Sequence, residues 1–187
     1  LAHTALEFKH GGVVGFDLAG DEEGYPAQIH VEAFNVARTG GLGITVHAGE
    51  AGGANNVLYA IRKLKATRIG HGIRSIESSS VMSLLRERNV LLELCPTSNV
   101  HTKTVSNIKE HPVDKFYGQG IPISIGDDDP VTSRTKVSQE LTLLENCFGF
   151  ELDDLKNIQR MSIEAAFITD PKLKAKLLKI VSNTQQL

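Results

Sequence analysis

The sequence predicts an α/β fold in which short strands alternate with helices and form a parallel sheet. Apolar, β-branched runs alternate with segments whose apolar residues recur at helical spacing, and polar or acidic residues follow several of the runs. This alternation favours parallel pairing with right-handed crossovers. A closed eight-stranded barrel usually needs about 250 residues. The chain has 187 residues, so we expect either an open five-stranded sheet or the later part of a barrel.

Five runs have the length and composition of strands, because they are short and rich in Val, Ile and Leu. The first run breaks into a loop rich in Gly and acidic residues, and the fourth ends at the pair Cys95-Pro96. Strands are predicted at 12–18, at 43–47, around Ile69, at 90–94 and at 121–125.

The segments between the strands have helical periodicity. Pro26 suits a helix start, and Gly40-Gly41 suits the end of the same helix. A second helix follows the Gly-rich loop 49–53 and carries an apolar stripe as far as Leu64. Residues 97–110 lack such a period and are predicted to form a long irregular loop. Helices are further predicted at 26–39, 75–88, 113–117, 133–148, 152–167 and 173–181.

The bulk properties argue against several functional classes. The formal net charge is -2 at pH 7, and we expect no nucleic-acid or membrane partner because both favour a basic surface. No apolar run reaches the ~18 residues of a transmembrane helix, and no secretory signal is recognisable. Two cysteines are typical of reduced thiols in the cytoplasm. Residues 1–187 are predicted to be a single domain, and the absence of an initiating Met indicates that the natural amino terminus lies upstream.

The segment 45–50, Thr-Val-His-Ala-Gly-Glu, ends the second predicted strand. His47 at the carboxyl end of a strand can offer a ring nitrogen to zinc. The small residues after it allow a tight turn that returns Glu50 toward the same cavity, where a partly desolvated carboxyl group can donate or accept a proton. The alternative is a core histidine followed by a glutamate that complements a helix dipole.

Two further strand ends carry candidate functional residues. His71 lies between glycines, which allow close approach to the backbone, and it is the next strand end after His47. Asp127, Asp128 and Asp129 follow the last strand, and three adjacent carboxylates repel each other unless a cation or hydrogen-bond donors offset them. We predict one metal ligand and one substrate contact among these acids. The alternative, a helix N-cap, would suffice for Asp127.

Other polar residues have weaker signals. Asp17 is a candidate buried hydrogen-bond partner, and Gly20 could place a bare backbone N–H against a flat ligand. The loop 95–99 supplies small polar groups at another strand end, although Cys95 is expected to pack and not to react. The remaining histidines are predicted to be exposed to solvent: His3, His10, His30, His101 and His111.

Together these phrases resemble the adenosine deaminase family of the metal-dependent amidohydrolase superfamily. The motifs His-Ala-Gly-Glu, Gly-His-Gly and Asp-Asp-Pro in this order are specific to the family, although each motif alone is not. The similarity covers nearly the whole chain and rests on these stretches: 13–22, 45–50, 68–72, 92–99, 124–130 and the helices around 157–167. It implies the later part, about five βα units, of a TIM-type (β/α)8 barrel followed by C-terminal helices.

The resemblance also implies a zinc ion at the carboxyl-terminal mouth of the barrel, one per complete site. His47 and Asp128 would be its ligands, Glu50 would donate a proton to the purine N1, and His71 would orient and deprotonate the attacking water. The implied reaction is the hydrolytic deamination of adenosine to inosine and ammonia by a hydroxide formed at the zinc ion.

For the small-molecule substrate, a purine nucleoside, the resemblance implies ring contacts from the Gly20 backbone N–H and from Asp129.

The sequence departs from the family in two ways. Asp127 stands where the family usually has a neutral residue, and the His-x-His pair of the first barrel strand is absent. Only two of the expected zinc ligands remain, so we expect the isolated chain to be inactive unless an upstream or companion polypeptide supplies the pair.

Three alternatives stay open from the sequence. One is another substrate within the same superfamily, either adenine or a modified adenosine. Another is a non-catalytic remnant or binding module, favoured by the missing first-strand ligands. The third is a free-standing five-stranded doubly wound domain unrelated to deaminases, which predicts no metal at His47 and Asp128.

Overall fold

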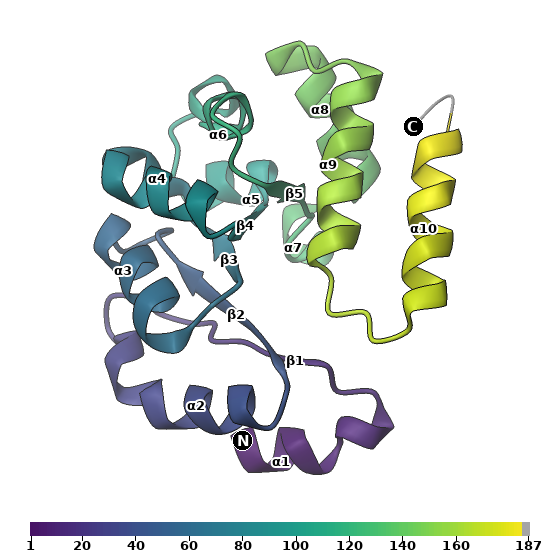
Figure 1. Cartoon of the computed structure of the whole chain (residues 1–187). Coiled ribbons are helices and arrows are strands. Elements are labelled where there is room, and N and C mark those ends of the chain that lie inside the picture. The colour runs from purple at the N-terminus through teal and green to yellow at the C-terminus, as the bar shows by residue number, and fades with distance from the viewer. Residues whose placement is uncertain (185–187) are drawn as a thin grey trace.

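The computed structural model describes residues 1–184 of the chain. Its centre is a five-stranded parallel sheet with the strands in chain order, which confirms the predicted pairing. Figure 1 shows the strands running through the middle of the molecule, with helices on both sides. The strands are β1 (Gly15–Phe16), β2 (Gly43–Ala48), β3 (Arg68–His71), β4 (Leu91–Leu94) and β5 (Ile123–Ile125).

Helices connect the strands and extend beyond the last of them. α2, α3 and α4 lie along one side of the sheet, whereas α8, α9 and α10 follow β5 and gather on the other side of the view (Figure 1). The α-helices are α1 (Ala2–Glu7), α2 (Val31–Thr39), α3 (Ala54–Tyr59), α4 (Ser79–Glu87), α5 (Pro96–His101), α6 (Val113–Gly118), α7 (Pro130–Ser133), α8 (Val137–Phe148), α9 (Leu152–Ala165) and α10 (Pro171–Asn183). Short non-α turns are η1 (Lys9–Gly11), η2 (Ala27–His30), the π-type η3 (Ala60–Leu64), η4 (Ile73–Glu77) and η5 (Ile108–Glu110).

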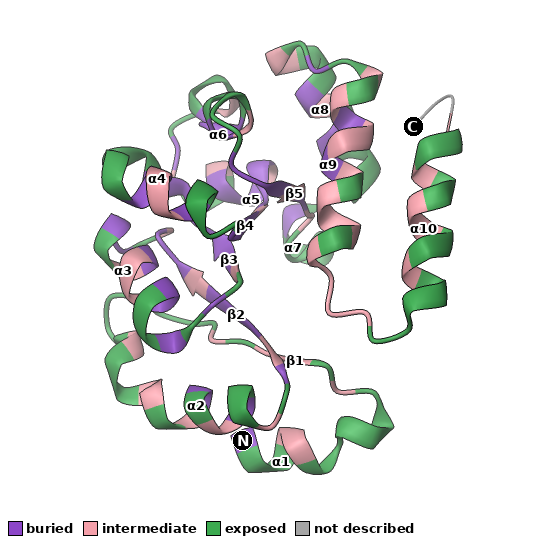
Figure 2. Cartoon of the chain, in the orientation of Figure 1, coloured by how far each residue is buried: buried purple, intermediate pink, exposed green. Residues whose placement is uncertain are grey.

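The core lies between the sheet and its covering helices. In β2, Ile44, Val46 and Ala48 are buried, and Thr45 and His47 point to the opposite face because successive strand residues alternate. Burying a side chain such as that of Ile44 or Val46 stabilises the fold by about 1.5–3 kcal/mol. Figure 2 shows the buried residues concentrated on the strands and on the helix sides that face them. The face of the sheet that carries Ile44, Val46 and Ala48 is therefore apolar, and polar residues lie on the opposite face.

The register of β2 and β3 brings two predicted site residues together. His47 pairs with Gly70, and Ala48 pairs with His71, so both histidines lie at the carboxyl end of the sheet. A Cβ atom on Gly70 would lie 3.0 Å from the Cγ atom of the His47 ring, which is closer than ordinary van der Waals contact. Glycine at this position therefore makes room for the imidazole of His47.

The face of the sheet that carries Thr45 and His47 is polar in its middle layer. Thr45 Oγ1 donates to Glu93 Oε2 over 2.6 Å, and Arg68 Nε lies 3.1 Å from Glu93 Oε1. The Arg68 guanidinium also stacks over the Phe167 ring, 3.8 Å from its centroid. A Cβ on Gly43 would collide with the same ring. The segment after α9 therefore folds back against β2 and β3.

Two sequence-based predictions are wrong in detail. The strand predicted at 12–18 contains only Gly15–Phe16, and both residues are half-buried. The predicted loop 97–110 contains α5 and η5. Pro96 fits the first turn of α5 because it has no N–H to leave unpaired. The buried side of α5 carries polar residues that bond to the site, so an apolar period could not reveal the helix. Across residues 1–184, no helix combines the length and apolarity needed to cross a membrane.

Candidate active site

His47 leaves the end of β2 and faces the segment after β1. Its Nδ1 lies 3.0 Å from Asp17 Oδ2, so Asp17 is a hydrogen-bond partner of His47. The sequence predicted a buried partner of unspecified identity, whereas Asp17 is exposed. The hydrogen bond that His47 donates to Asp17 raises the pKa of His47, and partial burial opposes the shift. With Nδ1 engaged, Nε2 is the nitrogen that remains for a ligand. A carboxylate behind a histidine is the usual support of a metal-binding imidazole.

His71 and Glu50 form the second part of the site. His71 is 3% exposed, and its Nε2 lies 3.4 Å from Glu50 Oε2. The His47 and His71 rings are 5.2 Å apart between centroids. Burial lowers the pKa of His71, and the Glu50 charge opposes the shift. The structure therefore brings the three residues predicted for metal binding, proton donation and water orientation into one cluster.

The Glu50 carboxylate is held by side chains from α5 and the turn after it. Thr102 Oγ1 donates to Glu50 Oε1 over 3.0 Å, and Asn99 Nδ2 lies 3.4 Å from the same oxygen. The Glu50 side chain is 24% exposed, so it keeps access to the site while its geometry is restrained. These two partners were not predicted, since both fall in the segment that was expected to be irregular.

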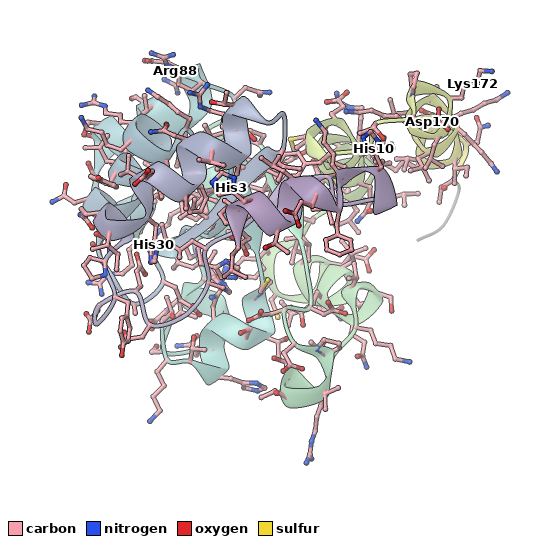
Figure 3. The ribbon with its side chains drawn as sticks, turned by 90° about the horizontal axis from the view of Figure 1, so that it is seen from below. His3, His10, His30, Arg88, Asp170 and Lys172 are labelled. Atoms are coloured by element: carbon pink, nitrogen blue, oxygen red, sulfur yellow. The ribbon has the colours of Figure 1, made fainter. Side chains whose placement is uncertain are left out.

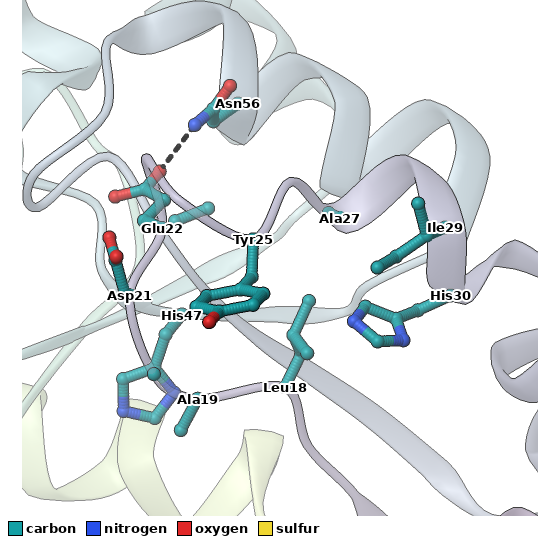
Figure 4. Close-up of a pocket in the computed structure, with 12 residues that line it drawn as sticks. Leu18, Ala19, Asp21, Glu22, Tyr25, Ala27, Ile29, His30, His47 and Asn56 are labelled. Atoms are coloured by element: carbon teal, nitrogen blue, oxygen red, sulfur yellow. Dashed lines mark hydrogen bonds between the residues drawn. The ribbon is translucent and has the colours of Figure 1, made fainter.

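The backbone around Glu50 is anchored by Glu22, a residue that sequence reasoning did not single out. The Glu22 carboxylate accepts hydrogen bonds from the backbone N–H groups of Gly49, Glu50 and Gly52 at 2.6, 3.1 and 2.8 Å. Asn56 Nδ2 donates to the same carboxylate over 2.9 Å, as the dashed line in Figure 4 shows. Glu22 therefore ties the loop after β1 to the loop that positions Glu50.

Glu22→Gln should destabilise the protein by about 2 kcal/mol or more, because charge-assisted hydrogen bonds contribute about 1.5–3 kcal/mol each and the amide turns two donors toward backbone N–H groups. Urea unfolding at pH 7 measures the change. Glu23→Gln is the matched control at the neighbouring exposed position, where we expect a change within about 0.5 kcal/mol. Equal stability of the two variants would contradict the anchoring role of Glu22.

The three acids after β5 have different environments. Asp128 adopts a left-handed backbone with φ 56°, accepts a hydrogen bond from Ser98 Oγ over 2.6 Å and contributes to raising the pKa of His47. Asp129 caps α7, and its bonds from the backbone N–H and hydroxyl of Thr132 lower its pKa. Asp127 is half-buried and has no hydrogen bond or ion pair within residues 1–184.

A cavity of about 310 Å³ opens beside His47. Its wall includes Gly20, Tyr25, His30 and Asn56 from the segments that follow β1 and β2. Figure 4 shows the His47 and Tyr25 rings at its edge. Gly20 has φ 131° and no atom within 4 Å of a built Cβ, so its bare backbone is accessible. The cavity therefore combines the predicted Gly20 contact with the predicted metal ligand, whereas Asp129 is not among its lining residues.

The donor set fits part of a zinc site. A His47 ring nitrogen backed by Asp17, and an Asp128 carboxylate held by Ser98, are chemically suited to zinc. Among the residues that the structure describes, no group of three or more His, Cys, Asp or Glu side chains is placed to hold a metal ion. Zinc sites typically use three or four protein ligands, so His47 and Asp128 alone would not complete one.

Two of the five histidines predicted to be exposed are not, because His111 is buried and His30 is half-buried. His111 is 1% exposed and bonds to Asn99 and to the backbone of Val113, whereas His3 and His10 are exposed as predicted, on α1 and the turn after it (Figure 3). His30 is half-buried at the cavity wall. Burial lowers the pKa of His111 to about 4. The only signal in the sequence was the helix start at Pro112-Val113, which places His111 next to a buried turn.

The buried His111 should make stability fall as the pH falls. Its folded pKa of about 4 lies below the ordinary histidine pKa of 6.5, so the unfolded chain binds the proton first on acidification. Between pH 7 and pH 5 this lowers the free energy of unfolding by about 2 kcal/mol. Urea unfolding at both pH values should show a smaller fall for His111→Gln. An equal fall in the two proteins would show that His111 is not the titrating group.

The fold and the clustered side chains define a barrel-type α/β protein with a polar site at the carboxyl ends of its strands. The model of the adenosine deaminase family matches residues 1–184. The chain belongs to the adenosine deaminase family. A curated relative, the adenosine deaminase of Clostridium acetobutylicum, is 41% identical over 168 residues, which cover 90% of this chain and 50% of the relative. The chain thus spans about half the length of the curated relatives it matches.

Solved structures agree on the fold. The adenine deaminase of Arthrobacter aurescens matches with a TM-score of 0.88 at 28% identity, over 97% of this chain and 57% of that one. An amidohydrolase from Burkholderia ambifaria with bound Zn matches with a TM-score of 0.84 at 25% identity, over 97% and 52%. An Arabidopsis protein complexed with IMP matches with a TM-score of 0.87 at 28% identity, over 97% and 52%. The sheet is therefore the later part of a (β/α)8 barrel, as predicted.

Proposed function

We propose that the protein to which this chain belongs deaminates adenosine hydrolytically to inosine and ammonia. The observation that carries the proposal is the Glu50 carboxylate held between His71 and Thr102, with the His47 ring beside it. A fixed carboxyl group next to two imidazoles can transfer protons to and from a bound ligand. Membership of the adenosine deaminase family supports the reaction class.

Zinc is the proposed cofactor, and the neighbour with bound Zn supports it. His47 and Asp128 would hold the ion, and a His-x-His pair from an upstream segment or a companion polypeptide would complete its ligands. When bound, zinc supplies Lewis acidity that lowers the pKa of water to about 7, so hydroxide forms near neutral pH. Asp17 and Ser98 orient the two ligands, since each bonds to one of them.

The remaining residues act on the purine and the attacking water. Glu50 donates a proton to ring nitrogen N1, which makes the neighbouring carbon more electrophilic. His71 orients the water. It can accept a proton from that water at Nε2 only in the tautomer that has no hydrogen on Nε2. Water adds to the carbon that bears the amine, and one of its protons passes to the amino nitrogen. The C–N bond then breaks to release ammonia, and the remaining hydroxyl proton returns to the Glu50 carboxylate as the C=O bond forms. The backbone N–H of Gly20 and the Asp129 carboxylate are the proposed contacts to other ring nitrogens.

The second candidate is another substrate at the same site. The adenine deaminase among the neighbours favours free adenine, and a modified adenosine stays open as predicted. The test is to assay the full-length protein, with zinc, on adenosine, adenine and N6-methylated adenosine. Product formation from adenosine with the highest kcat/KM supports the proposal, and preference for adenine assigns the alternative. No turnover of any of them would favour the non-catalytic binding module. Cytoplasmic localisation and inactivity of the isolated chain stay predictions.

A further inference from the structure

A line of buried polar side chains connects His111 to the candidate active site. His111 before α6 is 1% exposed, Asn99 on α5 is 0% exposed, and His71 at the end of β3 is 3% exposed. His111 contacts Asn99, Asn99 contacts His71, and His71 faces Glu50. Because polar groups at this depth are normally paired, the donor and the acceptor at each contact can be assigned in turn.

The assignment starts at a backbone amide, which can only donate. Val113 N donates to His111 Nδ1 over 3.2 Å, so Nδ1 carries no hydrogen. Burial keeps His111 neutral near pH 7 because it lowers the pKa to about 4. A neutral imidazole has one N–H, which must then be on Nε2. His111 Nε2 therefore donates to Asn99 Oδ1 over 3.2 Å.

The Asn99 side chain extends this assignment of donors and acceptors to the active site. With its carbonyl oxygen facing His111, its amide nitrogen faces His71 Nδ1 at 3.1 Å and Glu50 Oε1 at 3.4 Å. An amide nitrogen donates and does not accept. His71 Nδ1 is therefore an acceptor, and the hydrogen of neutral His71 is on Nε2, which is 3.4 Å from Glu50 Oε2.

We propose that His111, acting through Asn99, is a positioning residue that holds His71 in the tautomer with its hydrogen on Nε2. His71 then presents an N–H donor, and not a lone pair, to Glu50 and to water in the site. It orients the water without taking the proton at Nε2, which narrows the role implied by the family resemblance. The effect on turnover rests on the proposed deaminase function, whereas the tautomer itself does not.

The direct test is ¹⁵N NMR of the full-length protein with labelled histidines near pH 7, since this measurement distinguishes protonated from unprotonated ring nitrogens. Signals of His71 are assigned by their loss in His71→Gln. We expect a single form with hydrogen on Nε2. A form with hydrogen on Nδ1 in the unsubstituted protein would overturn the proposal, whether or not the protein is an active deaminase.

Two substitutions at one position separate the polar role of His111 from its packing role. In His111→Gln, the side-chain amide can donate to Asn99 and its carbonyl can accept from Val113 N, so His71 should keep its tautomer. In His111→Phe, a ring of similar size removes both bonds, Asn99 is free to rotate, and His71 should become a mixture of tautomers. An unchanged His71 spectrum in the Phe variant overturns the role of His111.

Circular dichroism establishes that each variant folds. If His111→Phe does not fold, Asn99→Asp replaces it in the test. An ionised carboxylate only accepts, so His71 should move its hydrogen to Nδ1, and a hydrogen that stays on Nε2 overturns the proposal. The packing role alone predicts no tautomer change in any variant that folds.

Turnover supplies an independent measurement. For His111→Phe we expect kcat for adenosine to fall about 10- to 100-fold, the usual cost of losing a supporting partner of a site histidine, with KM changed less than about threefold. His111→Gln should recover most of kcat. Unchanged kcat despite a shifted tautomer overturns the effect on turnover. If the unsubstituted protein lacks all deaminase activity, the proposed function fails while the NMR result still decides the tautomer.

Discussion

Glu50→Gln should lower kcat for adenosine deamination by about 100- to 10,000-fold, the range that a positioned general acid or base contributes. The amide has nearly the shape of the carboxyl group, so it can still accept from Thr102 through its oxygen. The amide is too weak an acid to transfer a proton to N1 and too weak a base to accept one. The hydrogen bonds that Glu22 accepts involve the backbone N–H of residue 50 and not its side chain, so the loop should keep its conformation.

Zinc content should remain at the unsubstituted level in this variant, because Glu50 is not one of the proposed ligands. Steady-state kinetics and elemental analysis on the same preparation measure both quantities. Glu23→Gln is the control, since it makes the same chemical change at an exposed residue of the loop after β1. Turnover within about threefold of the unsubstituted protein for Glu50→Gln would remove Glu50 from the proposed chemistry.

The sheet and the pairing of its site residues were predictable from local patterns. Apolar runs identified four of the strands closely, and the carboxyl ends of parallel strands meet at one edge of a sheet. The register places the ends of β2 and β3 side by side, so His47 and His71 lie as close as the order of motifs indicated. The first strand was overestimated because its apolar run continues into half-buried segments on both sides of Gly15–Phe16.

The residues that support the site were not predictable in the same way. Asn99 bonds to His71, which is 28 positions away, and Glu22 bonds to the backbone of Gly49, which is 27 positions away. Such partners are polar, so they add nothing to the periodic spacing of apolar residues from which helices and strands are predicted. Their contacts depend on how loops that are distant in the sequence meet in the fold. His111 was expected at the surface because the helix start that follows it is the only local sign of its burial.

Backbone strain at the site residues could not be predicted from the residue types either. His71 has φ 59° and Asp128 has φ 56°, in the left-handed region that costs most residues other than glycine about 1 kcal/mol or more. Two of the residues predicted to carry chemistry thus adopt unusual conformations at the ends of β3 and β5. Lys65, Asn89, Lys103 and Arg134 also have positive φ, so this conformation alone does not mark a functional residue.

Asp128→Ala should abolish most zinc binding by the full-length protein. The substitution removes one of the two proposed ligands on this chain and the carboxylate that accepts from Ser98 Oγ. We expect zinc affinity to fall by at least about 100-fold, since even supporting partners of a ligand contribute about 10- to 100-fold. Elemental analysis after dialysis measures the loss, and Asp127→Ala is the matched control at the neighbouring acid.

The left-handed conformation of Asp128 makes a second variant necessary. Alanine is strained at φ 56°, whereas asparagine tolerates this region, so Asp128→Asn tests the charge without changing the backbone preference. If both variants lose zinc while Asp127→Ala keeps it, the loss follows from the missing carboxylate. If Asp128→Asn retains full zinc content, Asp128 is not a ligand, and the zinc loss in Asp128→Ala would follow from backbone strain. In that case the proposed convergence of His47 and Asp128 on one ion would be wrong.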